Sequence, residues 1–588
     1  MQTRRIPWLR TLSASLLLLP AAPGLAQSLH SERGGLQSTD LVHRPSLTST
    51  TLDPLRSLAI SDHATVSTIT ARRVFDQLIR QAGDTGLTSD QLFRQLWDTQ
   101  NPAPGQPDLP GGPHCSDNGN TLNGAPYVCR PLEGADASAQ SVPLDRYILV
   151  GLFNRFDLAP VDGAHCGEYR MSFARFVAAP QVRSRNRFIL EGVLPNPAPE
   201  LGLEGCRPVA QAWARLSTLE DLTQRQALLN ALFFEGLAPG IPPVIHISHY
   251  GDNPSGAGQV RTNIFMQQGV GAPNPWMLRE FKLKHQCDAT GCTPRFIPVT
   301  VKSTPRGDFF NPLNTSPLAV GFRDHFITQV ASLAVDDFNR FNYAVPDVFN
   351  AAQSSSMPSF GSVDNFLVEF NKATTPNAFS DALQAELQRI GSTLTPHQVV
   401  ARAQLLSCGG CHDLSRGTDL GGTPGLVPID FKRFVQVDDL LSPLPPPGPD
   451  SRYALSTSLT TAFLPFRQQL LGAFLDTPVL DATVSAPDTQ VLHVQAGQPF
   501  RGTVQVANTG TTAWSAAQGV RATSLDGAAD LTLAPGEVIH FGQRKTFDFT
   551  HTAPTSLGQT TYRWRLHRNG LAFGPEVSLT VEVQPAPR

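Results

Sequence analysis

The 588-residue sequence carries little charge: Asp, Glu, Lys and Arg make up 16% of it, and its net charge is −3. A nucleic-acid-binding domain needs basic residues concentrated on one face, and a membrane-surface segment needs a run of like charge. The sequence contains neither pattern. We therefore expect no nucleic-acid partner for this chain.

Long apolar runs are absent after the first 26 residues. The run Leu12–Leu19 is too short to span a bilayer, which takes about 20 apolar residues. It follows three arginines and precedes a small-residue cleavage pattern that ends at Ala26, so we interpret residues 1–26 as a secretory signal peptide. We expect an exported bacterial protein, periplasmic, at the cell surface or secreted, with no transmembrane segment after cleavage.

The signatures of several enzyme classes are also missing, namely the nucleophile elbow, the phosphate-binding loop, the dinucleotide fingerprint and the zinc-protease motif. The polar stretch 154–170 contains Asp157 and Glu168, a pair that could do acid–base work; a salt-bridged sheet face is the alternative. His246 and His249 lie on an expected strand, where residues three apart point to opposite faces. That spacing argues against a shared metal site.

The eight cysteines fall into four pairs of near neighbours. An exported chain with an even number of cysteines usually forms disulfides, although sequence alone cannot fix the connectivity. Three pairs are our disulfide candidates: Cys115 with Cys129, Cys166 with Cys206, and Cys287 with Cys292.

The fourth pair, Cys408 and Cys411, fits the attachment motif of a c-type haem, Cys-Gly-Gly-Cys followed by His412. In this motif the two thiols add to the vinyl groups of the porphyrin, and the imidazole binds the iron as proximal ligand. The intervening glycines would let the backbone approach the macrocycle closely. A Cys408–Cys411 disulfide, a redox-active dithiol and a zinc site are the alternatives.

A predicted helix over 396–406 leads into this motif, because Thr395 and Gln398 form a capping box with Pro396 in the first turn. The stretch from Thr395 to Asp439 resembles the N-terminal part of a c-type cytochrome, which implies one covalent haem c. It departs from that family because no Met follows residue 357. Candidates for a distal iron ligand are Met266, Met277, Met357, His397 and Lys432.

The mature chain is long enough for about three domains, and its fold class is multidomain. After a partly ordered arm over 27–66, we expect an α+β domain with a largely antiparallel sheet over 67–317. A small all-α, cytochrome-c-like haem segment over 318–442 follows, and then a Pro-rich linker and helix over 443–484. Strands of the α+β domain are predicted at 147–153, 188–194, 244–249, 260–266, 278–284 and 296–301.

Residues 485–588 read as an Ig-like β-sandwich, with strands separated by Gly and Asn turns and with Trp514 and Trp564 in its core. The run from Asn508 to Trp514, together with Trp564 and the run 570–574, resembles the Ig-like four-tryptophan domain of the autophagy-receptor family. Two of the four tryptophans are missing, so the resemblance implies the fold more than a binding role.

These observations predict an exported monohaem c-type protein with an electron-transfer or haem-based redox role and an unspecified redox partner. One alternative is a non-redox protein that uses its Ig-like domain for adhesion or for binding a cell-surface partner. Another is a hydrolase or lyase that acts on an extracellular polymer through residues 145–300. That middle region resembles an uncharacterised exported bacterial family, which implies no activity.

Overall fold

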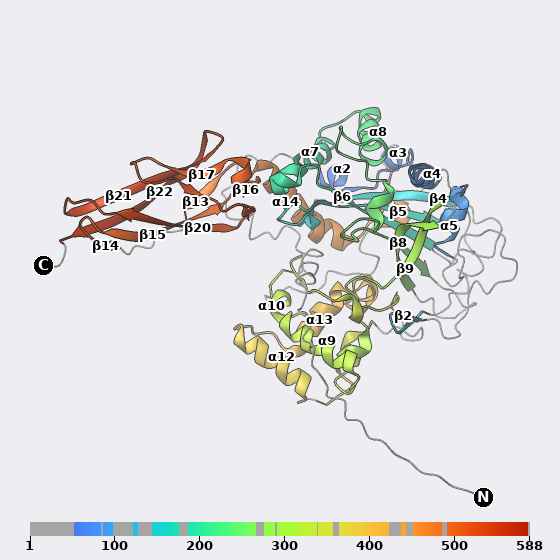
Figure 1. The fold of residues 1–588 in the computed structure, drawn as a ribbon. Helices are drawn as coiled ribbons and strands as arrows, with labels where there is room; N and C mark the ends of the chain where they lie inside the picture. Colours follow the sequence, from blue (N-terminus) through green and yellow to red (C-terminus); the bar gives the residue numbers. More distant parts are fainter. Residues whose placement is uncertain are drawn as a thin grey trace, which may run out of the picture.

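A computed structural model describes the chain in these ranges: 52–83, 86–97, 121–127, 144–175, 186–265, 276–288, 291–337, 339–356, 364–374, 376–422, 437–442, 451–484 and 491–585. The molecule is multidomain (Figure 1). A domain built on a large antiparallel sheet contacts a cluster of helices, and a β-rich domain projects from the sheet domain at the C-terminal end. The predicted signal peptide, Cys115, Cys129 and residues 443–450 of the predicted linker lie outside the described residues.

The large sheet has the strand order β1-β4-β5-β6-β7-β8-β10, and β9 pairs with β8. All of these pairs are antiparallel. The bounds are β1 Ala59–Ile60, β4 Tyr147–Arg155, β5 His165–Arg175, β6 Asn186–Pro195, β7 Gln259–Phe265, β8 Trp276–Asp288, β9 Gly291–Val299 and β10 Ser354–Ser355. The antiparallel sheet expected from the sequence is confirmed.

Both faces of this sheet are covered. In β6, Phe188 and Leu190 face a core that helices of the same domain complete, whereas Ile189, Glu191 and Val193 line a cavity on the other face. The helices are α4 Ala71–Ala82, α5 Ser89–Arg94, α7 Arg207–Arg215 and α8 Leu222–Asn230. Because the second face is covered too, the strands lack the simple apolar–polar alternation of a solvent-facing sheet.

The sheet domain includes segments that the sequence analysis placed elsewhere. Within the expected arm, Leu52–Val66 forms α2 (Pro54–Ser57), β1 and α3 (His63–Val66), and its apolar residues belong to the domain core. Late in the chain, β12 (Arg452–Leu455) pairs with β11 (Val437–Ser442), and α14 (Leu464–Asp476) packs Phe474 on Phe156 of the core. The expected boundaries at 66 and 443 are therefore corrected, since packing joins both segments to the sheet.

One local prediction is also corrected. Residues 244–249 form no strand, because Pro242 and Pro243 precede them and the His246 side chain accepts a hydrogen bond from the backbone N–H of Ser248, starting a 3-10 turn, Ile247–Tyr250. Helix α5 is capped by Thr88, which forms a capping box with Gln91.

The helical cluster lies on the cavity side of the sheet (Figure 1). Its elements are α9 Pro317–Thr328, α10 Val330–Leu333, α11 Phe366–Phe370, α12 Ala378–Arg389 and α13 Pro396–Leu406. They surround a core rich in Phe, in which Phe310 stacks on Phe366 and meets Phe322 edge to face. The predicted capping box at Thr395 and Gln398 is present.

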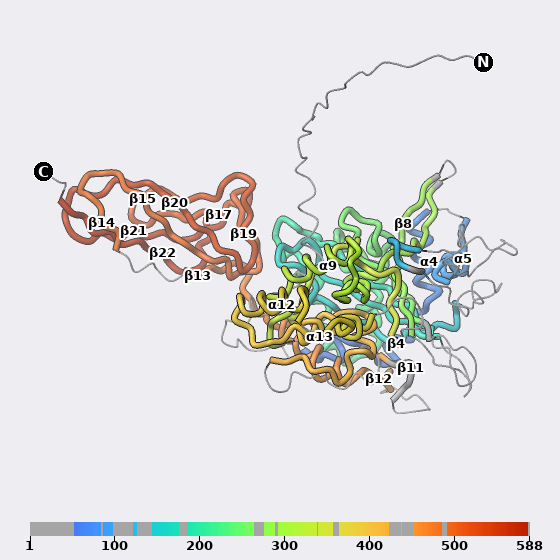
Figure 2. The backbone as a smooth tube through the Cα atoms, turned by 90° about the horizontal axis from the view of Figure 1, so that it is seen from below, coloured from blue at the N-terminus to red at the C-terminus, as the bar shows by residue number. Residues whose placement is uncertain are grey.

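The C-terminal domain is a sandwich of two sheets, β13-β15-β20 and β14-β22-β21-β17-β18, with Trp514 and Trp564 fully buried in its core as expected. It projects away from the rest of the molecule (Figure 2). Its inner end contacts the 3-10 segment Pro199–Cys206, where the Ala513 N–H donates to the Leu201 carbonyl at 3.0 Å.

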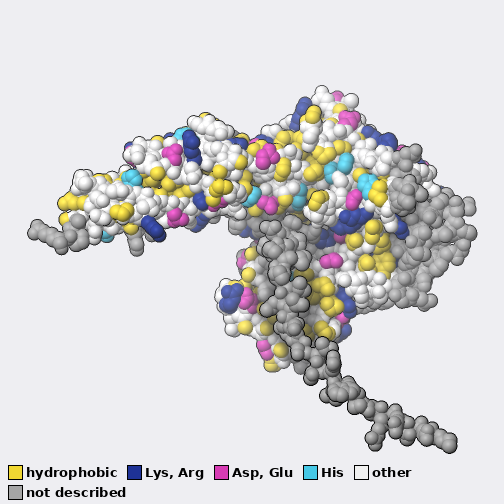
Figure 3. Space-filling view, viewed as in Figure 1, with side chains coloured by type: hydrophobic (Ala, Val, Ile, Leu, Met, Phe, Trp, Pro, Cys, Tyr) yellow, Lys and Arg dark blue, Asp and Glu magenta, His cyan; other side chains and the backbone are white. Residues whose placement is uncertain are grey.

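The strands of the sandwich are β13 Ala482–Val484, β14 Leu492–Gln495, β15 Pro499–Asn508, β17 Val520–Ser524, β18 Leu531–Thr532, β20 Arg544–Thr552, β21 Gly558–Arg568 and β22 Leu571–Gln584. Two short strands, β16 Trp514–Ser515 and β19 Val538–Ile539, pair with each other. On the visible face of the whole molecule, Lys and Arg side chains are interspersed with Asp and Glu (Figure 3).

Candidate functional site

Cys408, Cys411 and His412 lie where helix α13 ends. Ser407 terminates α13, and a short turn of π-helix, Gly410–Leu414, carries Cys411 and His412. A Cβ at Gly410 would lie 1.8 Å from the Gln404 carbonyl oxygen, and one at Gly409 would lie 2.7 Å from Asp364 Oδ2. The glycines are therefore required by packing inside the protein, which is a different reason from the approach to a macrocycle that the motif suggests.

The cysteines divide into two chemical groups. Cys166 is bonded to Cys206 and Cys287 to Cys292, so two of the three predicted disulfides are confirmed. Cys408 and Cys411 form no disulfide bond. Burial raises the pKa of the Cys408 thiol, which lies 3.6 Å from the Thr304 hydroxyl and packs beside Trp276, Leu278 and Val301. This thiol is neutral at pH 7.

The His412 imidazole stacks on the indole of Trp276, with 4.2 Å between ring centroids and 17° between ring planes. Burial lowers the pKa of His412 to about 4, so the ring is neutral at pH 7. A neutral imidazole is the form that binds a metal. Strand β8 thus holds the orientation of the side chain that the sequence identifies as the proximal ligand.

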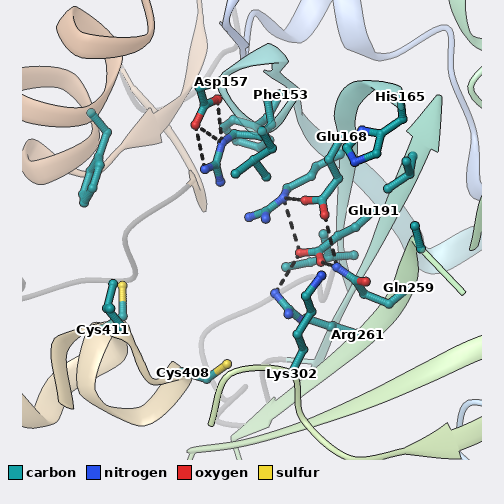
Figure 4. A pocket seen from close by; sticks show the side chains of 18 of the residues that line it. Phe153, Asp157, His165, Glu168, Glu191, Gln259, Arg261, Lys302, Cys408 and Cys411 are labelled. Atoms are coloured by element: carbon teal, nitrogen blue, oxygen red, sulfur yellow. Dashed lines mark hydrogen bonds and ion pairs between the residues drawn. The ribbon is translucent and has the colours of Figure 1, made fainter. Parts of the chain in front are cut away.

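All three motif residues line one cavity of about 690 Å³ between the helical cluster and the sheet. Figure 4 shows the two sulfur atoms on one side of this space and the charged side chains of the sheet on the other. Apolar side chains complete the wall, among them Phe153, Leu278, Phe341, Leu405, Leu459, Phe463 and Phe466. The volume falls within the range of about 300–1,000 Å³ that is typical of ligand and cofactor pockets.

The sheet wall of the cavity carries a chain of ion pairs. Arg155 donates to Asp157 at 2.8 Å through Nη2, and Arg170 pairs with Glu168. Glu191, which is fully buried, accepts from Arg261 at 3.1 Å. Further members are Gln259, which donates to Glu168 and Glu191, and Glu280, which pairs with Arg261 at 3.0 Å.

Asp157 and Glu168, the carboxylates singled out in the sequence, therefore line this cavity, and each forms an ion pair with an arginine. The neighbouring guanidinium groups outweigh burial and lower the pKa of both carboxyls, that of Glu168 to about 2. Both are ionised at pH 7 and hold no proton to donate. The salt-bridged sheet face that the sequence left as an alternative is present, and it faces the haem motif.

The candidate distal ligands are not brought to the cavity where the structure describes them. His397 is exposed near the start of α13, and Met277 is fully buried in β8 without lining the cavity. Met266, Met357 and Lys432 lie outside the described residues. Two other histidines, His165 and His249, do line the cavity.

The prediction that His246 and His249 point to opposite faces of a strand was wrong, because these residues are not on a strand. Their rings lie 4.9 Å apart. Burial lowers the pKa of His249 to about 4, so this ring is neutral at pH 7. Within the described ranges, no group of three or more His, Cys, Asp or Glu side chains is arranged to hold a metal ion.

Sequence reasoning missed Trp276 and Arg467, both of which line the cavity. Trp276 lies two residues before the predicted strand 278–284, and its neighbour in the motif, His412, is distant in sequence. Arg467 gives a weak signal, since it is a cation between Phe466 and the buried Leu470 and Leu471 on an apolar helix. A cation in such a position indicates a buried polar partner.

Comparison with known proteins identifies one part of the chain. Residues 486–583 match the family model of the Ig-like domain from next to BRCA1 gene, so the C-terminal sandwich is an Ig-like domain. The match includes none of the residues that line the cavity. No curated protein matches the chain. Among the described helices, none has the length and apolar character needed to cross a membrane.

Proposed function

We propose that the protein is an exported monohaem c-type protein, with one haem attached to Cys408 and Cys411 and with His412 as its proximal ligand. One observation carries the proposal: both unbonded thiols and the neutral imidazole line the same 690 Å³ cavity. The other four described cysteines are paired in disulfides. The main alternative is a disulfide between Cys408 and Cys411, and this bond is not present.

The residues of the cavity suit a haem in three respects. Leu405, Phe341 and Phe463 belong to an apolar wall that would contact the porphyrin faces. Arginines at the sheet wall offer partners for its carboxylates. Together with the thiols and the imidazole, these features supply the ligation and the burial that a protein uses to tune a haem.

When bound, the haem would supply one-electron redox chemistry at its iron. The contribution of the chain itself follows from the contacts described above. Trp276 fixes the plane of the His412 ring, and Thr304 contacts the Cys408 sulfur. We infer an electron-transfer or haem-based redox role from this arrangement.

The visible spectrum tests this proposal. The full-length gene is expressed in a bacterium that attaches c-type haem, and the exported protein is purified. We expect a Soret band that survives acid–acetone extraction, and its loss in the Cys408→Ser/Cys411→Ser variant. The matched control is Cys287→Ser/Cys292→Ser, which removes the disulfide that joins β8 to β9 and should keep the band. A colourless wild-type protein would contradict the proposal.

The match of residues 486–583 to an Ig-like family supports a second proposal, adhesion to a cell-surface partner through this domain. It predicts that the full-length protein sediments with bacterial cell walls whether or not Cys408 and Cys411 are present. Failure to sediment in either form would count against adhesion.

A further inference from the structure

Arg467 is a buried cation whose charge is poorly matched inside the protein. It projects from α14 into the cavity, and only 11% of its side chain is exposed. Its one ion pair is long, 3.7 Å from Nε to Asp157, and its guanidinium lies 5.7 Å from the Phe463 ring centre. Among the described residues it makes no hydrogen bond.

Asp157 does not neutralise Arg467, because Arg155 already binds that carboxylate. Arg155 uses Nε and Nη2 for this purpose, at 2.8 to 3.1 Å, and its Nη1 has no hydrogen-bond partner among the described residues. Arg170 likewise bonds Glu168 through Nε. Three guanidinium groups thus line one part of the cavity with donors to spare.

More positively than negatively charged side chains line the cavity. The cations that line it are Arg155, Arg170, Arg261, Lys302, Arg340 and Arg467, and the carboxylates are Asp157, Glu168 and Glu191. Glu280, behind Arg261, and Asp337, which lies 3.7 Å from Arg340, add two more negative charges. Burial and the repulsion of Arg155 lower the pKa of Arg467 to about 9, which agrees with a cation that lacks a close anion.

We propose that Arg467, with Arg155 and Arg170, forms a subsite that binds a carboxylate entering the cavity. A guanidinium presents paired N–H donors that match the two oxygens of a carboxylate, and a charged buried group gains most from such a partner. Phe463 and Phe466 line the cavity on the same helical segment and would contact the apolar part of the molecule that bears the carboxylate.

Two kinds of molecule carry a carboxylate that would fit this subsite. One is a propionate of the attached haem, and this source rests on the proposed function. The other is the carboxylate of a small organic molecule that enters the cavity as a ligand or substrate. Comparison of haem-free and haem-loaded protein separates them.

The first arm uses the full-length Cys408→Ser/Cys411→Ser protein, which cannot attach haem, and benzoate as the probe in isothermal titration. We expect saturable binding that weakens at least tenfold in an added Arg467→Gln and weakens less in Arg467→Lys, which keeps the charge but lacks the paired N–H donors. The control is Arg389→Gln, an exposed arginine outside the cavity. Inorganic phosphate should compete poorly with benzoate.

The second arm repeats the titration with haem-loaded protein. Binding of benzoate that persists assigns the subsite to a free carboxylate. Binding that disappears, together with a shifted haem midpoint potential in Arg467→Gln, assigns it to a propionate. The proposal is overturned if the haem-free protein binds no benzoate in an Arg467-dependent way and Arg467→Gln leaves the potential unchanged. Because the first arm needs no haem, its result is independent of whether the wild-type protein attaches haem.

Discussion

The imidazole of His412 lies flat against the indole of Trp276, a contact that joins the motif to strand β8 of the large sheet. Trp276 is 2% exposed, so its ring is held by the protein on the side away from His412. The proposed ligand is thus oriented by a strand distant in sequence, in the way that outer-shell partners orient metal ligands.

Replacing Trp276 by Ala should loosen the ligand without removing the attachment points. We expect the covalent haem to remain, with a changed Soret position, and the free energy of unfolding to fall by about 3–5 kcal/mol. Trp276→Phe should keep most of the wild-type Soret position and most of the free energy of unfolding. Optical spectra and urea unfolding check this; an unchanged spectrum in Trp276→Ala would show that the stacking does not orient the ligand.

Gly410→Ala should disrupt the motif, because the added Cβ would lie 1.8 Å from a backbone oxygen. We expect a loss of about 3 kcal/mol or more of stability, since backbone cannot move aside as a side chain can. Gly321→Ala in α9 is the matched control. Its Cβ would have 3.9 Å to the nearest atom, and Ala there should stabilise the helix by up to about 1 kcal/mol. Equal stabilities in the two variants would contradict the packing described here.

Asp364 gives the site a pH dependence. It is buried beneath Gly409, where burial raises its pKa to about 7 although it accepts a hydrogen bond from the Ser355 N–H at 2.7 Å. The folded state binds this proton more tightly than the unfolded state, so stability should fall as pH rises from about 4 to 7. The penalty is fully present above pH 7 and reaches at most about 4 kcal/mol.

Asp364→Asn should remove this dependence, because the amide mimics the protonated acid. We expect the variant to gain stability relative to the wild type across the range from about pH 4 to 7. Unfolding in urea at a series of pH values measures the difference. Parallel curves for the two proteins would show that the pKa of Asp364 is not raised.

Glu191 holds the ion pairs of the sheet wall together. Its side chain is fully buried and lies within ion-pair distance of both Arg170 and Arg261. Glu191→Ala leaves two buried arginines short of a partner, so we expect a loss of about 3–5 kcal/mol in stability. The control is Glu386→Ala, in a pair with a largely exposed arginine, which should change stability little. Similar losses in both variants would contradict the burial described for Glu191.

The sequence predicted the local features of the fold better than its long-range ones. The capping box at Thr395 and the helix that leads into Cys408 depend on neighbouring residues, and both are present. The Ig-like core around Trp514 joins distant strands, and it was predicted from the spacing of turns and from the resemblance to a known domain. The places of Leu52–Val66 and of α14 in the sheet domain depend on packing between distant segments, and the expected boundaries missed them.

The same distinction applies to the site. The motif and the polar stretch around Asp157 were each visible in the sequence, but nothing in either indicated that they face one cavity. That depends on α13 ending at the cavity, opposite the charged wall of the sheet. Trp276 and Arg467 become functional candidates only through this packing.

The most direct test of the central claim is the intact mass of the mature protein from a host that attaches c-type haem. The account predicts a mass higher by one haem than the cleaved chain, and digestion should place it on the peptide that contains Cys408 and Cys411. A mass without haem, with these two cysteines joined to each other, would contradict the account.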